Sequence, residues 1–340
     1  IMRVSKNFLK IIVQLLFVII IFSTVPAKSL DKFRYDDRIS DYFSGILLLN
    51  NNNYEQSFQF LKKLKGLESS HKNYSLKYLY SLVNTGNIVE AFLFSKKLEK
   101  QNLESFESLI ITGVYYLKNS KIDLAKEYFL RANNIDSRLI LNAYVSNSLY
   151  NWVSVKDLSL EISISKLNKL DKRFENLKKI QNVFLNCYFN SSKTNLLFKE
   201  LIENEKTDFS RYNYFYAKYL DNQGKKIEAT KIVESALKKY PRNLLLNQYK
   251  INLKLKKNIS NFNCSNKEEI VAELLYIAAN ALSTQSYFQI SNFYLNLSKY
   301  LNNNFHSFDI LLAENFYKIE DLESAKEIYK KLRGNGDAFK

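Results

Sequence analysis

Small residues recur at an interval of 34 positions, each within a similar sequence of apolar and polar residues. Ser57, Ala91 and Ala125 are 34 residues apart, and Ser291 and Ala325 repeat the spacing. An interval of this size is typical of proteins in which each unit buries its apolar face by stacking on its neighbours. The pattern therefore predicts one elongated array of repeats.

A second set of positions, twelve residues before each small residue, is small in five of six cases. Ala229 is counted in this register because it follows Ala125 after 104 residues, which is three intervals plus two. The second set comprises Gly45, Leu79, Gly113, Ala217, Ala279 and Ala313, with Leu79 as the exception. Small residues at this separation let two paired helices approach closely, and larger neighbours fill the flanking space. We therefore expect Gly113 and Ala125 to face each other across two adjacent helices.

This pattern resembles the tetratricopeptide repeat, a 34-residue antiparallel helix pair with small residues at positions 8 and 20 and larger ones at positions 11 and 24. Position 24 is large in this chain except at Ser95, and the proline common at position 32 is present only as Pro241. The match is good over residues 38–137, 210–243 and 272–333. The resemblance implies an all-α fold, a right-handed superhelical solenoid of antiparallel helix pairs. Two prolines and seven glycines in 340 residues also favour long helices, since β-rich folds need frequent turn residues.

The agreement is weaker between these segments. Residues 138–170 and 176–203 have the lengths of two further helix pairs, with position 20 near Ser159 and Thr194. The 62 residues from Ala229 to Ser291 are too few for two repeats. We therefore expect an unpaired helix over 243–257, then a loop over 258–266 that is the candidate hinge. The repeat array would span 28–257, and further repeats would span 267–340.

The first 27 residues have the layout of a signal peptide. Arg3, Lys6 and Lys10 precede an apolar run over 11–22, and Val25 and Ala27 are small residues suited to cleavage before Lys28. An uncleaved membrane anchor is the alternative, because the apolar segment approaches the roughly 20 residues that a spanning helix needs. Both interpretations place the rest of the chain in the periplasm of a bacterial cell envelope, free or anchored to the inner membrane.

The chain carries a formal charge of +16, which loss of the three cations of the signal peptide reduces to +13. Such a charge attracts nucleic acid, anionic lipid or acidic proteins. Lysines are spread along the chain, and the abundance of Lys, Asn, Ile, Tyr and Phe is what AT-rich coding produces. Export also argues against nucleic acid as the partner, so we expect none, while contact with a membrane surface is possible. The lysine pairs Lys62–Lys63, Lys96–Lys97 and Lys330–Lys331 lie late in second helices, where cations complement the helix dipole.

Candidate catalytic chemistry is sparse. The two histidines, His71 and His306, lie in polar segments beside helices without a matching set of Cys, Asp or Glu, and we expect them at the surface. No phosphate loop, paired-cysteine zinc motif or nucleophile elbow is present in the sequence. We expect no enzyme activity, cofactor, metal or small-molecule substrate. Cys187 and Cys264 are expected to be unpaired, although a bridge is possible in an oxidising periplasm.

Relatives of this repeat family generally bind partners on the concave surface, which first helices line. The resemblance implies a largely apolar and aromatic groove for a protein or peptide, since aromatic anchors dominate such interfaces. Candidate groove residues are Tyr42, Ile46, Tyr80, Ile110, Tyr214, Lys218, Tyr276 and Asn280. The function expected is a non-catalytic scaffold for protein–protein interactions. The alternative is the helical accessory part of an envelope enzyme, similar to a lytic transglycosylase, whose catalytic part is not in this chain.

Overall fold

The computed structural model of the protein describes residues 30–135, 140–255 and 261–339. The predicted signal peptide lies outside these residues. The described residues form α-helices and short 3-10 turns with no β-strand. Six helix pairs come first in the chain: α2 (Leu30–Asn50) and α3 (Tyr54–Leu61), α4 (Lys72–Asn84) and α5 (Ile88–Lys100), α6 (Phe106–Lys118) and α7 (Ile122–Asn134), α8 (Ile140–Val153) and α9 (Leu160–Asn168), α10 (Glu175–Tyr188) and α11 (Thr194–Ile202), α12 (Tyr212–Asn222) and α13 (Lys226–Lys239).

The remaining helices form the C-terminal part. They are α14 (Leu244–Lys254), the pair α15 (Lys267–Thr284) and α16 (Phe288–Leu301), and the pair α17 (Ser307–Lys318) and α18 (Leu322–Arg333). Short 3-10 turns are η1 (Lys62–Leu64), η2 (Leu67–Ser69), η3 (Val155–Asp157), η4 (Lys172–Phe174) and η5 (Asp337–Phe339). The all-α array of helix pairs predicted from the sequence is confirmed. None of the described helices is long and apolar enough to cross a membrane.

Small residues at the predicted positions are the points where paired helices cross. The Ser57 hydroxyl donates to the Gly45 carbonyl at 2.8 Å, and the Ser291 hydroxyl donates to the Ala279 carbonyl at 2.8 Å. These bonds join position 20 of a repeat to position 8. In the α6–α7 pair, Gly113 and Ala125 are both buried, and a Cβ atom on Gly113 would overlap the Phe129 ring. The close approach that requires these small residues is confirmed.

The two pairs with weak sequence agreement are also present, but one register is corrected. Ser159 is not at a helix crossing: it is the N-cap of α9, and its hydroxyl accepts from the Ile162 amide at 3.3 Å. The buried small residue is Ser163, whose carbonyl accepts from the Asn151 side chain at 3.0 Å. An amide at position 8 therefore bridges the helices where five other pairs, those of Gly45, Gly113, Ala217, Ala279 and Ala313, use Gly or Ala. Thr194 is buried and is the first residue of α11.

Helix ends follow ordinary capping rules. Glu268 and Glu269 lie in the first turn of α15, where the Asn266 side chain accepts from both of their amides. His71 is the N-cap of α4 and accepts from the Tyr74 amide. Lys97 lies in the last turn of α5 and pairs with Glu68, as expected for a cation near a helix C-terminus.

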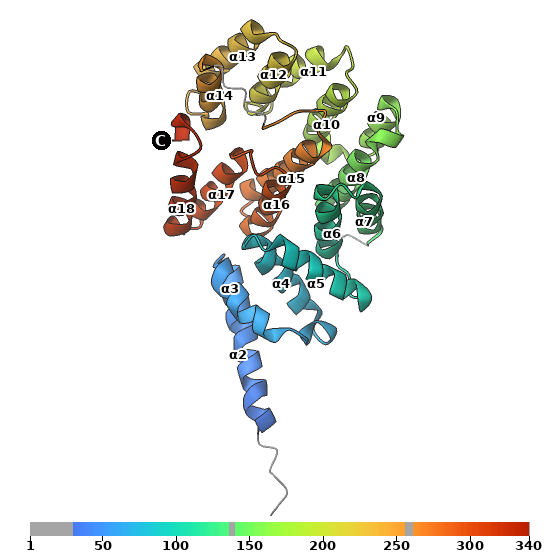
Figure 1. Cartoon of the computed structure of the whole chain (residues 1–340), viewed down its shortest axis with the longest axis vertical. Helices are drawn as coiled ribbons and strands as arrows, with labels where there is room; N and C mark the ends of the chain where they lie inside the picture. The colour runs from blue at the N-terminus through green and yellow to red at the C-terminus, as the bar shows by residue number, and fades with distance from the viewer. Residues whose placement is uncertain (1–29, 136–139, 256–260, 340) are drawn as a thin grey trace, which may run out of the picture.

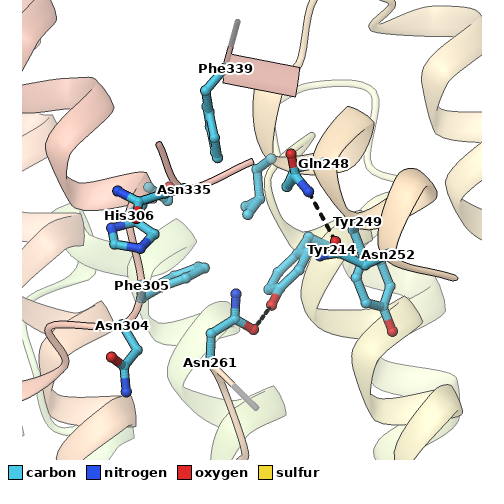
Figure 2. Close-up of a pocket in the computed structure, with 12 residues that line it drawn as sticks. Tyr214, Gln248, Tyr249, Asn252, Asn261, Asn304, Phe305, His306, Asn335 and Phe339 are labelled. Atoms are coloured by element: carbon cyan, nitrogen blue, oxygen red, sulfur yellow. Dashed lines mark hydrogen bonds between the residues drawn. The ribbon is translucent and has the colours of Figure 1, made fainter. Parts of the chain in front are cut away.

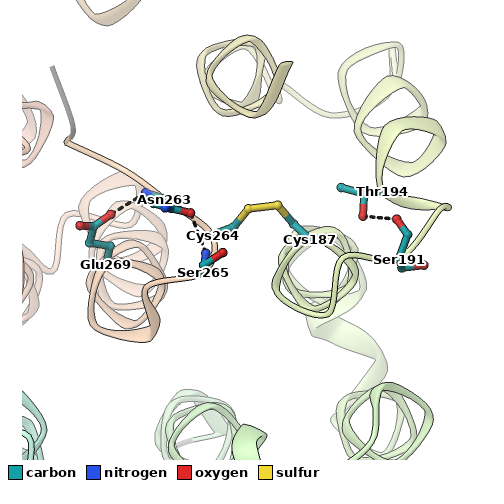
Figure 3. The surroundings of a disulfide bond; sticks show 7 residues. All are labelled: Cys187, Ser191, Thr194, Asn263, Cys264, Ser265 and Glu269. Atoms are coloured by element: carbon teal, nitrogen blue, oxygen red, sulfur yellow. Dashed lines mark hydrogen bonds between the residues drawn. A yellow bond between two sulfur atoms is a disulfide. The ribbon is translucent and has the colours of Figure 1, made fainter. Parts of the chain in front are cut away.

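Cys187 and Cys264 form a disulfide, so the prediction that they are unpaired is wrong. Cys187 lies near the end of α10 and Cys264 in the loop before α15, and Figure 3 shows these segments side by side. Their Cα atoms are 5.9 Å apart, a separation typical of disulfides. The loop is therefore tied to the N-terminal array at Cys264, and whether residues 258–266 act as a hinge stays a prediction.

Candidate partner-binding groove

First helices of successive repeats line the inner side of the array, and the chain's own C-terminal helices pack against them. Helix α16 contacts α4 and α6, and α15 contacts α8 and α10. In Figure 1, α15 and α16 lie in the middle of the molecule beside these helices. The predicted groove is therefore not open along its length, because an internal helix pair occupies much of it.

Side-chain amides join α16 to the N-terminal helices. The Gln289 side chain donates to the Leu49 backbone carbonyl at 3.0 Å, and the Asn84 side chain donates to the Gln289 backbone carbonyl at 3.3 Å. Asn292 is fully buried and donates to the Tyr54 hydroxyl at 3.0 Å. The contact removes these polar groups from water, and the hydrogen bonds provide the partners that buried polar groups need.

Aromatic contacts continue along the same interface. The Tyr80 and Phe293 rings meet edge to face with centroids 5.2 Å apart, and Tyr115 stacks on Tyr300 at 6.4 Å. At the far end, the Lys118 ammonium donates to the Leu301 carbonyl at 2.8 Å. The C-terminal end of α16 is thus capped by a cation from α6, which favours this seating of the helix.

The structure distributes the predicted groove residues among several environments. Ile110 is completely buried, Lys218 is 3 % exposed, and Tyr276 is held beneath the Arg211 guanidinium at 3.7 Å. Tyr42 and Ile46 are half-buried on α2, where Tyr42 packs against His71, and Asn280 is exposed on α15. Tyr80 and Tyr214 each line a cavity. The eight residues do not form one surface, because the returning helices separate them.

Arg211 explains why Tyr276 is unavailable. Its Nε and Nη2 atoms donate to the two carboxylate oxygens of Glu273 at 2.8 and 2.7 Å, and Glu273 is fully buried. The same guanidinium lies over the rings of Tyr276 and Phe305. A bidentate pair with aromatic stacking is the arrangement that suits a buried arginine. The cluster joins α12 to α15 and the start of α17, so its role is structural.

A cavity of about 340 Å³ remains between the N-terminal helices and α15–α16, and we call it the groove pocket. Most of its lining is apolar, and Ile140 and Tyr287 at its edge are 39 % and 58 % exposed. Helices α4, α6, α8, α15 and α16 and turn η4 contribute side chains. The lining comprises Tyr80, Glu107, Ile140, Leu141, Asn142, Phe174, Ala281, Leu282, Gln285, Tyr287, Ile290, Phe293 and Tyr294.

Glu107 is the one charged side chain among the described residues that line the groove pocket. Its carboxylate accepts from the Tyr80 hydroxyl at 3.2 Å. Burial raises the pKa of Tyr80 and of Tyr294, and the negative charge of Glu107 raises both further. Both phenols therefore stay neutral at physiological pH. The groove pocket presents aromatic and aliphatic carbon with a single negative charge.

The sequence prediction missed Phe293 and Tyr294 because it drew candidates from first helices. It missed Glu107, which lies on the first helix α6, because it took candidates from only two positions of each first helix. Phe293 and Tyr294 lie on α16, the second helix of its pair, which is buried on more than one face. Five consecutive residues of α16, Ser291 to Leu295, are buried. A helix that is buried all round must have neighbours on every side, so the run Phe293-Tyr294-Leu295 was the available signal.

No protein-family model matches the chain, and no curated protein matches it. Among solved structures, it is similar to a chain of the APC/C hetero-tetramer Cut9–Hcn1, with 16% identity, a TM-score of 0.36, and coverage of 84% of this chain and 51% of that one. It is also similar to yeast Tom70, with 13% identity, a TM-score of 0.29 and coverage of 88% and 69%. A third likeness is to the human IFIT1 dimer with PPP-AAAA, with 15% identity, a TM-score of 0.30 and coverage of 85% and 66%.

These neighbours are helical repeat proteins of the tetratricopeptide type. The chain spans about half the length of the Cut9–Hcn1 chain it matches. TM-scores this low do not establish a common arrangement of the repeats. The fold assignment accordingly rests on the helix crossings of this chain, such as those at Gly45 and Ala279.

Proposed function

We propose that the protein is a non-catalytic scaffold that binds a protein partner, and that the groove pocket holds an apolar side chain of that partner beside a positive charge. The observation that carries the proposal is the lining of this pocket: five aromatic rings and five aliphatic side chains around one carboxylate. Pockets of this size and composition accept apolar anchors, which supply most of the affinity in protein interfaces.

The charge of Glu107 gives the proposal its specificity. The Glu107 carboxylate attracts a cation that binds at the edge of the apolar cavity, and the neighbouring Tyr80 ring attracts the same cation through a cation–π interaction. An acidic partner segment would be repelled by Glu107. We therefore infer that the recognised segment places Lys or Arg next to a large apolar residue.

We further propose that the chain is exported and works in a bacterial cell envelope. The basic and apolar segment before Lys28 supports export. The Cys187–Cys264 disulfide supports it independently, since disulfides persist in oxidising compartments and are rare in the cytosol. Both cysteines of the chain are used in this one bond.

Site-specific crosslinking in intact cells tests the scaffold proposal. A photo-crosslinking amino acid at Tyr287 lies at the pocket edge, and one at Tyr317, which is 65 % exposed and outside the lining, is the matched control. We expect a discrete protein adduct from position 287 only. Adducts of the same protein from both positions, or from position 317 alone, would place the partner elsewhere.

A substitution at the pocket edge tests the chemistry. Ile140→Glu adds a second negative charge beside the opening, and Leu124→Glu on α7 changes a residue of equal exposure, 38 % against 39 %. We expect Ile140→Glu to abolish the adduct at position 287 and Leu124→Glu to leave it unchanged. Equal adduct yields in the two variants would refute an apolar anchor at this pocket.

A further inference from the structure

A second cavity, of about 300 Å³, lies between α12, α14, η5 and the segment that precedes α17. We call it the amide pocket. Figure 2 shows side chains from these elements converging on one space, with Phe339 entering from η5 on the side opposite Asn261. The lining comprises Tyr214, Leu245, Gln248, Tyr249, Asn252, Asn261, Asn304, Phe305, His306, Ser307, Asn335 and Phe339.

The lining has no Asp, Glu, Lys or Arg among the described residues. Two acidic groups lie behind the lining and are paired: Asp221 accepts from the Tyr249 hydroxyl at 3.0 Å, and Asp309 lies 3.6 Å from the His306 ring while pairing with Lys299. A charged ligand would lose hydration here without gaining a counter-ion. The amide pocket therefore selects an uncharged ligand.

Its amides are partly fixed and partly available. Gln248 donates to the Asn252 side-chain oxygen at 2.9 Å and accepts from the Ala338 amide at 3.0 Å, which holds both side chains in place. The Nδ2 groups of Asn252 and Asn261, and the whole amide of Asn304, have no partner among the described residues. Asn252 lines the cavity, and its Nδ2 keeps some accessible surface there, although the residue as a whole is only 6 % exposed. These donors are therefore free to bond a ligand in the cavity.

Buried aromatic rings pack against one another behind these amides. Tyr214 stacks on Phe305 with centroids 5.6 Å apart, and Tyr249 meets Tyr214 edge to face at 5.1 Å. Tyr214 also donates its hydroxyl to the Asn261 side-chain oxygen, which aims the free Nδ2 of Asn261 away from that bond. The half-buried side chains of Leu245 and Phe339 add accessible apolar surface, and such a lining with polar groups at its margin suits a ligand that has apolar faces and a polar rim.

We propose that the amide pocket binds a neutral saccharide of one or two sugar rings. The amides come from several directions, with Asn252 on α14, Asn261 and Asn304 on separate loops, and Asn335 beyond α18. A sugar ring projects hydroxyls around its whole rim and carries C–H groups on its faces, and each amide can both donate to and accept from a hydroxyl. A nucleobase has its polar atoms along part of its edge, which matches this distribution less well.

Ligand-detected NMR and thermal shift on the purified full chain test this proposal. The probes are N-acetylglucosamine and its β1,4-linked disaccharide, with glucosamine and glucuronate as charged counterparts and adenosine and a neutral tripeptide as other amide-binding ligands. We expect saturable binding of the neutral sugars, with a dissociation constant on the order of 1 mM for the single ring. The charged sugars should bind at least about tenfold more weakly.

Two adjacent residues provide matched variants. Asn304→Leu removes an amide of the pocket, and Asn303→Leu changes a neighbour that is also exposed and does not line it. We expect about five- to tenfold weaker sugar binding for Asn304→Leu and no change for Asn303→Leu. Absence of saturable sugar binding, equal effects of the two variants, or tighter binding of adenosine or the tripeptide would overturn the proposal. None of these outcomes bears on the groove pocket, which shares no lining residue with the amide pocket.

Discussion

The Cys187–Cys264 bond closes a loop of the chain that contains four helices, α11 to α14, and its removal is the most direct test of how the array is held together. The two cysteines are 77 residues apart in sequence. In the chain-entropy model, a crosslink that closes a loop of this length lowers the entropy of the unfolded chain and so raises its free energy by about 4.5 kcal/mol. Replacing both cysteines by alanine should therefore lower the free energy of unfolding by as much as this value.

The expected effect on heat stability follows from the size of the chain. If the described helices unfold together, 4.5 kcal/mol corresponds to a fall in Tm of about 7 °C. The contribution of lost packing is smaller than this entropic effect because alanine keeps the Cβ atom and each site loses one sulfur. Both sites are buried, with Cys187 3 % and Cys264 8 % exposed. Serine would be a poorer choice, since it would bury a hydroxyl.

Urea denaturation of the chain purified from an oxidising compartment, with and without reductant, provides the measurement. Reductant should lower the midpoint of the parent chain towards that of the Cys187→Ala/Cys264→Ala variant and should leave the variant unchanged. The reasoning is refuted if the parent chain shows two free thiols before reduction. It is also refuted if the double variant unfolds at the same urea concentration as the oxidised parent.

Three further predictions concern packing, closure and pH. Gly113→Val should lower the free energy of unfolding by about 1–3 kcal/mol, since its side chain would overlap Phe129, whereas Gly334→Ala, which meets only ordinary contacts, should change it by less than about 0.5 kcal/mol in urea denaturation. Asn292→Leu should cost about 1–3 kcal/mol by leaving buried partners unsatisfied, and hydrogen exchange should then rise in α16 and α3 together. Burial acts to raise the pKa of Glu99, but hydrogen bonds from Lys96, Arg131 and Tyr128 outweigh it and lower that pKa to about 2. Because the folded pKa is depressed, the stabilisation from Glu99 is complete above the pKa of the unfolded chain, near pH 4.5, and is lost as pH falls towards 2. Glu99→Gln should reduce the pH dependence of the urea midpoint across this window.

The pairing of helices was predictable from the sequence because it depends on neighbouring residues. Gly45 and Ser57, or Ala279 and Ser291, are twelve positions apart, so one local pattern encodes each crossing. The predicted register was wrong at Ser159 because the pattern searched for small residues only. There the crossing uses Asn151 and Ser163, and a hydrogen-bonding amide replaces the small side chain that the pattern requires.

The candidate site was less predictable because it depends on contacts between distant segments. Tyr54 and Asn292 are 238 residues apart, and Tyr80 meets Phe293 across a similar interval. A repeat pattern specifies how each pair stacks on the next, but small rotations at each step accumulate and decide whether the array returns on itself. The Cys187–Cys264 pairing was missed for this reason: it joins two segments that meet only because α15 lies against α10.

Closure of the groove decides which surface a partner can reach. Separating α16 from the N-terminal helices would expose Phe293, Tyr294 and Tyr80. Exposure of each large apolar side chain costs about 1.5–3 kcal/mol of free energy. The hydrogen bonds of Gln289 and Asn292 would add about 1 kcal/mol each, and together these terms approach the whole stability of a typical domain. A partner with a Kd near 1 µM gains only about 8 kcal/mol in total. Opening the groove would consume most or all of that gain, so the proposed function requires recognition with α16 in place, at the groove pocket that the closed structure leaves accessible between Ile140 and Tyr287.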